Sequence, residues 1–144
     1  MIKLVPYDNQ QHESVMLQYY SIKDLNRYTN KGKYYLLSLL GIYYSDYYIL
    51  ENNHTPVGCI LIRKKMSLKY PKASWIYDVF IMPEYRGKGY SKELMRLAFD
   101  KCTYPQVYLY VHKDNTTALR LYERMGFYEV GILNDEKLLR YDKV

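Results

Sequence analysis

The passage from a strand to a helix across a glycine-containing turn constrains the fold more than any other part of the sequence. Ser74–Met82 is rich in aromatic and β-branched residues, which is typical of a buried strand. The next segment, Pro83–Ser91 (PEYRGKGYS), contains Gly87 and Gly89, and we call it the glycine turn. Apolar residues then recur at helical spacing over Ser91–Cys102. The sequence therefore predicts a strand that leads through the glycine turn into an amphipathic helix.

The glycine turn has the chemistry of an anion site. Its glycines let the backbone approach a ligand closely, and the first N–H groups of the next helix lack intrahelical partners. Arg86 and Lys88 add positive charge for phosphate groups. The motifs GxGxxG and GxxxxGK(S/T) are absent, which excludes a Rossmann or P-loop site. The turn predicts a site for the pyrophosphate of a nucleotide-like cofactor; the alternative is an ordinary basic strand-to-helix turn.

A second strand and helix follow with a different set of polar groups. Val107–Val111 reads as a strand and Asn115–Met125 as a helix that ends at Gly126. Asn115 lies at the expected helix start, where it can be a plain N-cap or a ligand contact. Tyr122 lies on the apolar face, where it can be core packing or a positioned proton donor.

The remaining patterns complete a mixed α/β architecture. Strands are predicted over Ile2–Tyr7, Tyr47–Glu51, Val57–Lys65, Phe127–Leu133 and Lys137–Tyr141, and helices over Gln10–Tyr20 and Ile22–Thr29. Residues 52–56 are predicted to be a hairpin loop, while Tyr34–Tyr44 fits either a helix or a buried strand. The order β-α-α-β-β-β-α-β-α-β-β predicts an α/β (α+β) mixed sheet in one domain, residues 1–144.

Charge and cysteine content limit the partners and the compartment. The net charge is +6, but the basic residues do not form one block, which argues against a nucleic-acid surface. No apolar run reaches the roughly 18 residues that span a membrane, and no signal peptide is evident. Two cysteines, Cys59 and Cys102, are too few for a disulfide framework, so we expect a cytoplasmic protein.

Together these segments resemble the GNAT superfamily of acyl-CoA-dependent N-acyltransferases. VFIMP followed by EYRGKGYS is similar to that family's motif A, with core (Q/R)-x-x-G-x-(G/A), which Arg86 and Gly89 match. Ser91 departs from the usual Gly or Ala, although it is small and can still offer its N–H. DNTTALRLYERMGF is similar to motif B. The resemblance is strong from about Ile76 to Phe127, and elsewhere it extends only to the strand order.

The resemblance implies a GNAT-like acyl-CoA N-acyltransferase fold, with acetyl-CoA as cosubstrate and no metal. The backbone of Val79, Phe80 and Ile81 would pair with the pantetheine arm and stabilise the developing oxyanion. Pyrophosphate contacts would come from Arg86, Gly87, Lys88, Gly89, Tyr90, Ser91 and Lys92. Asn115 would contact the cofactor arm, and Tyr122 would protonate the leaving thiolate. The histidines, His12, His54 and His112, are scattered and have no metal-ligand spacing.

Several candidates for the general base stay open. Strict alternation puts Trp75, Tyr77, Val79 and Ile81 on one face of the strand and Ile76, Asp78, Phe80 and Met82 on the other. A carboxylate among apolar neighbours suits a base, so Asp78 is a catalytic candidate; a structural hydrogen bond or a contact with acceptor charge is equally open. Tyr77 or a water chain could serve instead.

The acceptor is expected to be a small-molecule or peptide primary amine that attacks the acetyl group directly. Enzymes of the diamine type carry Glu-Asp in this strand. Tyr77-Asp78 keeps only the second residue, so the sequence allows a polyamine acceptor but does not support one. Enzymes of the ribosomal N-terminal type carry a Glu at the position of Tyr110, so the tyrosine argues against that subgroup. An aromatic pocket among the 20 tyrosines could hold a cationic amine or could be core. We expect a monomer or homodimer; the alternatives are a non-catalytic CoA-binding module and a basic nucleic-acid-binding domain.

Overall fold

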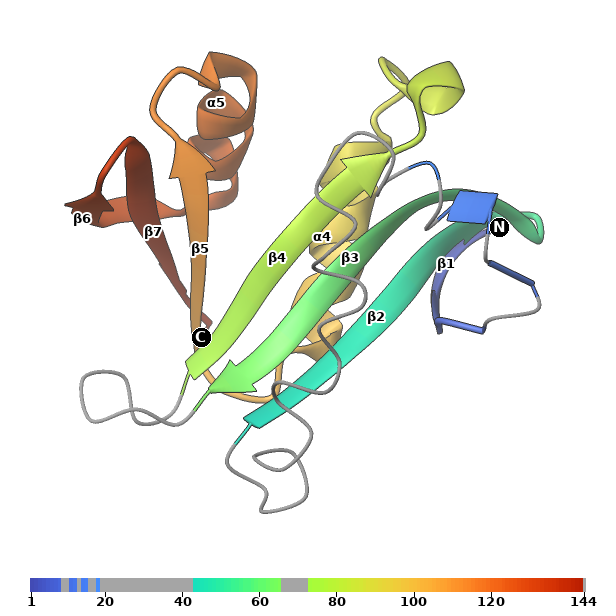
Figure 1. Ribbon diagram of the computed structural model, residues 1–144, viewed down its shortest axis with the longest axis horizontal. Helices are drawn as coiled ribbons and strands as arrows, with labels where there is room; N and C mark the ends of the chain where they lie inside the picture. The colour runs from blue at the N-terminus through green and yellow to red at the C-terminus, as the bar shows by residue number, and fades with distance from the viewer. Residues whose placement is uncertain (9–10, 13, 16–17, 19–42, 66–72, 144) are drawn as a thin grey trace.

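A computed structural model describes residues 1–8, 11–12, 14–15, 18, 43–65 and 73–143. Their strands form one mixed sheet in the order β1-β2-β3-β4-β5-β7-β6, in which only β4 and β5 run parallel (Figure 1). The strands are β1 (Ile2–Pro6), β2 (Tyr43–Asn52), β3 (Thr55–Lys65), β4 (Ala73–Ile81), β5 (Gln106–His112), β6 (Tyr128–Leu133) and β7 (Glu136–Asp142). The helical elements whose bounds are fully described are the 3₁₀ turn η2 (Pro83–Tyr85), α4 (Tyr90–Lys101) and α5 (Thr116–Met125).

These elements confirm the predicted fold class and the predicted succession of strands along the chain, with most boundaries shifted by one or two residues. The predicted helix Ile22–Thr29 and most of Gln10–Tyr20 lie outside the described residues, although those described between 11 and 18 are helical. Of the ambiguous run Tyr34–Tyr44, only Tyr43 and Tyr44 are described, and both belong to β2.

The predicted hairpin between β2 and β3 is confirmed, but its loop is shorter than residues 52–56. β2 and β3 continue to a two-residue turn at Asn53 and His54, which have φ values of 50° and 68°. Positive φ at both central residues is the arrangement of a type I′ turn, whose twist suits a tight hairpin. Strands β2 and β3 are therefore longer than the loop-forming residues at 52–56 suggested.

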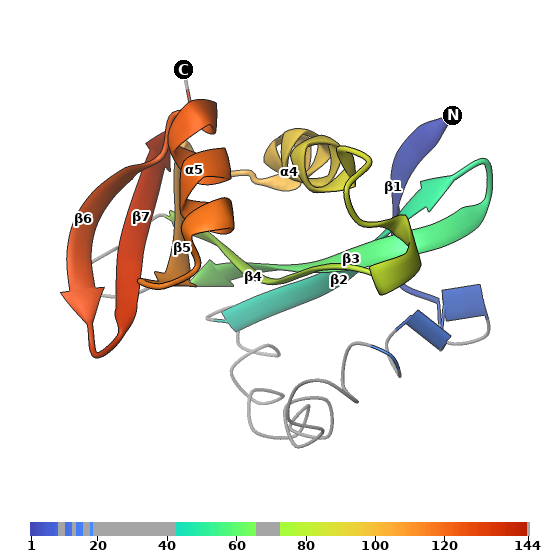
Figure 2. The ribbon, with the colours of Figure 1, turned by 90° about the horizontal axis from the view of Figure 1, so that it is seen from above.

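Both α4 and α5 lie on the same side of the sheet (Figure 2). The main apolar core fills the space between them and the strands, with Leu94, Met95 and Ala98 from α4 fully buried. Tyr122 and Leu119 of α5 join the same cluster. The amphipathic pattern of each helix thus predicts its buried face, because this face packs directly on the sheet.

The opposite side of the sheet carries a stack of aromatic rings. Trp75 of β4 stacks on Tyr108 of β5 at a centroid distance of 4.9 Å, and on Tyr110 at 5.9 Å. Tyr77 stacks on the same indole at 6.3 Å. Part of the unusual tyrosine content therefore packs in this second cluster.

β4 carries a β-bulge near its centre. Cys59 lies opposite Phe80 and Leu61 lies opposite Tyr77, so one residue of β3 faces two residues of β4. Asp78 is one of those two and has φ 55°, a conformation that aspartate tolerates better than most residues. The bulge therefore inserts one extra residue into the strand.

This extra residue overturns the predicted strict alternation along β4. The alternation puts Val79 and Ile81 on the face of Trp75 and Tyr77, whereas both pack with Ile76 in the core under the helices. A one-residue insertion sends every later side chain to the other face. The bulge thus sets which groups of β4 meet the helices.

Gly58 on β3 accommodates the bulge. A Cβ at this position would lie 2.3 Å from the carbonyl oxygen of Phe80 and 2.8 Å from Cδ1 of Ile81. Any side chain would push the two strands apart, so the bulged geometry requires glycine here.

Candidate active-site pocket

β4 and β5 pair only at their beginnings and then separate. The parallel register runs from Ala73 opposite Gln106 to Ile76 opposite Leu109, and beyond that point the strands diverge (Figure 1). A pocket of about 360 Å³ occupies the opening. It is lined by Ile76, Tyr77, Asp78, Val79, Leu109, Tyr110, Val111, His112, Asn115, Ala118, Tyr122 and Glu136. Ligands of α/β sheets bind at such carboxyl ends of parallel strands.

The glycine turn connects β4 to α4 as predicted. Gly87 has φ 78°, and Gly89, the N-cap of α4, has φ 82°. An added Cβ would have no heavy atom within 4 Å at either glycine. No side chain caps α4, and the N–H groups of its first turn have no intrahelical acceptor. The helix therefore begins with exposed backbone donors and with open space beside the glycines.

The polar side chains around the glycine turn partly serve its structure. Arg86 donates from Nε to the carbonyl oxygen of Ile81 at 2.9 Å, and its guanidinium lies 5.5 Å from the ring centroid of Phe80. The Tyr90 hydroxyl accepts a hydrogen bond from Nδ2 of Asn52 at 2.9 Å. Lys88 is exposed, with Nζ 5.8 Å from the ring centroid of Tyr85. Arg86 thus ties the turn to the end of β4.

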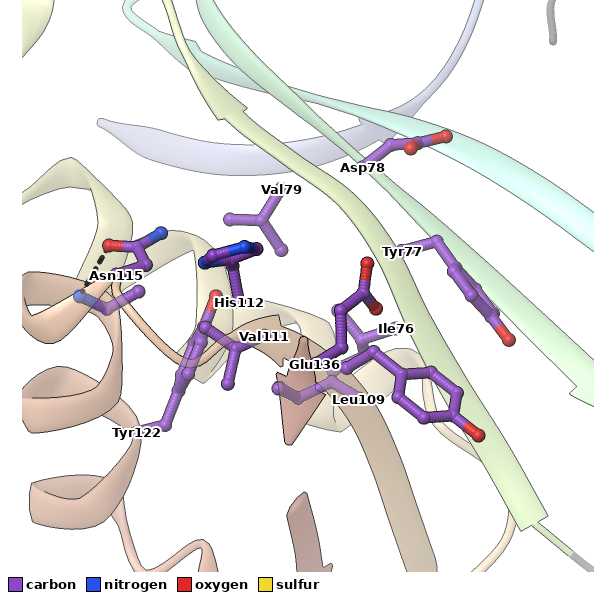
Figure 3. A pocket seen from close by; sticks show the side chains of 12 residues that line it. Ile76, Tyr77, Asp78, Val79, Leu109, Val111, His112, Asn115, Tyr122 and Glu136 are labelled. Atoms are coloured by element: carbon purple, nitrogen blue, oxygen red, sulfur yellow. Dashed lines mark hydrogen bonds between the residues drawn. The ribbon is translucent and has the colours of Figure 1, made fainter. Parts of the chain in front are cut away.

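Asn115 caps α5. Its Oδ1 accepts a hydrogen bond from the backbone N–H of Ala118 at 3.2 Å. Figure 3 shows the side-chain nitrogen of Asn115 on the side of the pocket. The N-cap prediction is confirmed, and one donor of the same amide is left facing the pocket.

Tyr122 is a buried residue whose hydroxyl reaches the pocket. Its side chain is 7% exposed and contacts the Phe127 ring edge-on at 5.7 Å between centroids. The hydroxyl points into the pocket (Figure 3), and the described residues offer it no hydrogen-bond partner. Burial raises the Tyr122 pKa to about 12, because the phenolate would lose its hydration. The group therefore stays protonated at neutral pH.

Asp78 differs from its predicted surroundings. Its carboxylate accepts a hydrogen bond from the Tyr47 hydroxyl at 2.8 Å, and it points away from Tyr122 (Figure 3). The expectation of purely apolar neighbours is therefore wrong. The bulge turns this side chain toward β2, so Asp78 and Tyr122 lie at the pocket without facing each other.

The pocket also contains residues that the sequence did not single out. His112, at the end of β5, lies opposite Glu136 of β7 in the antiparallel register. The His112 ring accepts a hydrogen bond at Nδ1 from the Asp114 N–H at 3.2 Å. Only the pairing of two distant strands brings Glu136 here, so no local motif could have found it.

The described part of the chain contains neither a cluster of metal-ligating side chains nor a helix that could cross a membrane. Its His, Cys, Asp and Glu side chains nowhere gather in threes suited to a metal ion. None of its helices combines the length and apolar character needed to cross a membrane.

Comparison with known proteins agrees with this geometry. The model of the acetyltransferase (GNAT) family matches residues 13–127. Spermidine N(1)-acetyltransferase from Vibrio cholerae is 33% identical over 85 residues, covering 55% of this chain and 49% of the relative. N-alpha-acetyltransferase RimI from Mycobacterium tuberculosis is 37% identical over 57 residues, covering 40% and 36%. The matches thus span less than half the length of these two relatives.

Solved structures share the whole fold. Spermidine N-acetyltransferase from Vibrio cholerae, in complex with CoA and spermine, gives a TM-score of 0.70 at 18% identity, covering 99% of this chain and 95% of that one. Arabidopsis thaliana Naa50, bound to the bisubstrate analogue CoA-Ac-MVNAL, also gives 0.70 at 18% identity, covering 98% of each chain. At such identities the likeness shows the fold alone.

Proposed function

Because the chain belongs to the acetyltransferase (GNAT) family, we propose that it transfers the acetyl group of acetyl-CoA to a primary amine. One observation carries the proposal: α4 begins uncapped beside the opening between β4 and β5, and the Tyr122 hydroxyl lies inside that opening. Two similar structures were determined with CoA or a CoA-containing analogue, which supports the same cosubstrate.

The residues present fit CoA. Open space beside Gly87 and Gly89 leaves room for a pyrophosphate against the backbone, and the uncapped first turn of α4 supplies N–H donors and the positive end of the helix dipole. The N–H groups from Gly87 to Lys92 hold the phosphates, and the charges of Lys88 and Lys92 reinforce them. Ser91 contributes its N–H, as the usual small residue would.

The separated edge of β4 receives the arm of the cosubstrate. β5 no longer pairs with β4 beyond Ile76, so the backbone of Val79, Phe80 and Ile81 can pair with the amides of an extended ligand. The same edge offers an N–H to the acyl oxygen. Asn115 donates from the amide nitrogen that its capping role leaves over.

Tyr122 acts as the general acid. Acetyl-CoA supplies an activated thioester, and Tyr122 gives a proton to the sulfur that departs. Its raised pKa of about 12 keeps the phenol protonated throughout the neutral range. The proton that the amine nitrogen loses after attack returns to Tyr122, so the residue ends each cycle unchanged.

Asp78 reaches the acceptor amine only indirectly. Its hydrogen bond with Tyr47 holds the carboxylate toward β2. We assign it the removal, through water, of the proton that an ammonium form of the acceptor loses before attack; the proton lost after attack goes to Tyr122. A cytoplasmic location accompanies this function, because the buried thiols of Cys59 and Cys102 are free.

A screen of amine acceptors with thiol release as readout tests the proposal. Peptides with free N-termini, lysine, polyamines and aminoglycosides are incubated with acetyl-CoA and the protein. We expect thiol release above the acceptor-free rate with at least one class. Binding of CoA without release for any acceptor would instead indicate a CoA-binding module without turnover.

A further inference from the structure

We propose that Glu136, at the start of β7, binds a protonated amino group of the acceptor while a neutral amino group of the same molecule attacks the acetyl group. This inference rests on the proposed acetyltransferase function and names the chemical class of its acceptor, a cationic amine.

The pocket is acidic on a basic protein. The chain has a net charge of +6, yet the described lining of the pocket contains two carboxylates, Asp78 and Glu136, and neither lysine nor arginine. His112 is the remaining ionisable group besides the tyrosines. A concave site with this charge attracts cations and repels anionic amines.

The two carboxylates are used differently. Asp78 accepts a hydrogen bond from Tyr47. Within the described residues the Glu136 carboxylate has neither an ion pair nor a hydrogen bond, and it projects into the pocket between His112 and Tyr77 in Figure 3. Glu136 is therefore the carboxylate available to a ligand.

The strand pairing fixes where this carboxylate lies. Glu136 is directly opposite His112 in the register of β5 with β7, so its backbone belongs to the sheet and not to a loop. Sites built on strands hold a side chain more precisely than sites on loops. The register thus presents Glu136 at a defined point of the pocket wall.

Two tyrosine rings form part of the pocket wall near Glu136. Tyr77 and Tyr110 line the pocket and are half-buried. Both stack on Trp75, at 6.3 and 5.9 Å between centroids, which fixes their rings. Aromatic faces attract cations, and the Arg63 guanidinium already lies 4.6 Å from the centroid of the Tyr77 ring. The rings therefore shape the wall beside Glu136, and the Glu136 carboxylate is the group that favours a protonated amine.

The test measures binding of 1,4-diaminobutane to the protein saturated with CoA, by calorimetric titration, so that it needs no turnover. We expect Glu136→Gln to weaken diamine binding about tenfold, while Glu136→Asp restores most of it. Glu129→Gln is the matched control, because Glu129 lies outside the pocket on β6, with its carboxylate 4.0 Å from Nζ of Lys137. This control should bind the diamine as the wild type does, and all variants should keep their affinity for CoA.

Two results would overturn the inference and leave the proposed function standing. One is equal diamine affinity in wild type and Glu136→Gln. The other is CoA binding by the wild type without diamine binding at tens of millimolar. Failure of the wild type to bind CoA would instead contradict the proposed function itself.

Discussion

Helices α4 and α5 each follow one of the two neighbouring parallel strands, β4 and β5. The first backbone N–H groups of α5 have a side-chain cap, whereas those of α4 have none. α5 begins at Asn115, whose side chain accepts a hydrogen bond from Ala118. α4 begins at Gly89, which has no side chain to offer, and no other side chain caps it. A helix start that lacks an internal acceptor needs water or a ligand as its partner.

This difference suggests separate roles for the two helices in the site. We infer that the exposed start of α4 anchors the phosphates, while α5 supplies groups to the opening between the strands. Tyr122 lies two turns into α5 and reaches the pocket from the buried side of that helix. Anchoring and chemistry are thus assigned to different helices, and each can be perturbed separately.

The largest expected effect follows from filling the space at the start of α4. Gly89→Val introduces a branched side chain where no atom lies within 4 Å of the Cβ position. We expect CoA binding to weaken by more than about 100-fold, because the side chain occupies the phosphate position. The measurement is the shift of the melting temperature with CoA concentration.

A second glycine controls for backbone strain. Gly126, the C-cap of α5, also has positive φ, at 107°, but it lies outside the glycine turn. Gly126→Ala should lower the melting temperature and leave CoA affinity unchanged. Unaltered CoA binding in Gly89→Val would show that the phosphates bind elsewhere.

The variant Tyr122→Phe tests whether the Tyr122 hydroxyl of α5 acts as the general acid. We expect kcat to fall about 100-fold, a usual size for the loss of a general acid. CoA affinity should stay within about twofold, because the ring still packs against Phe127 and only the hydroxyl is lost. Equal losses of kcat and of CoA affinity would assign Tyr122 a structural role.

The same hydroxyl should also make stability depend on alkaline pH. Its pKa is about 12 when folded against 10.0 as the ordinary value, so its contribution is complete below pH 10 and is lost as pH rises toward 12. The unfolding free energy of the wild type should fall relative to Tyr122→Phe by about 2 kcal/mol between about pH 9 and pH 11.5. Urea denaturation of both proteins measures the difference; parallel pH profiles would contradict burial of the phenol.

The smallest expected effects come from two variants of Asn115, which distinguish its role as the N-cap of α5 from its contact with CoA. Asn115→Asp keeps an acceptor for the Ala118 N–H and removes the amide donor, whereas Asn115→Ala removes both. The alanine variant should lose about 1 kcal/mol of unfolding free energy and the aspartate variant almost none. Both should bind CoA several-fold more weakly. Wild-type CoA affinity in Asn115→Asp would mean that Asn115 is only a cap.

Local sequence patterns predicted those features of the two helices that depend on residues close together in the chain. The glycines before α4, the amphipathic faces of both helices and the Asn115 cap are all encoded within a few residues. The strand order also followed, because each strand has a recognisable run and a turn after it. Tyr122 could be assigned to the pocket only through the family resemblance.

Long-range pairing explains what the sequence could not predict. The bulge at Asp78 depends on the close approach of β3 at Gly58, and it redirects Asp78 toward Tyr47. Glu136 reaches the pocket because β7 pairs with β5. Neither arrangement leaves a periodic signal in the strand itself, so alternation alone gave the wrong faces for Val79 and Ile81.

The most direct test of the unequal helix starts is a titration of ¹⁵N-labelled protein with acetyl-CoA, followed by amide chemical shifts. We expect the amides from Gly87 to Lys92 to shift strongly and saturably, while those of Thr116 and Thr117 at the start of α5 shift far less. Equal shifts at the two helix starts, or none at millimolar acetyl-CoA, would contradict this expectation.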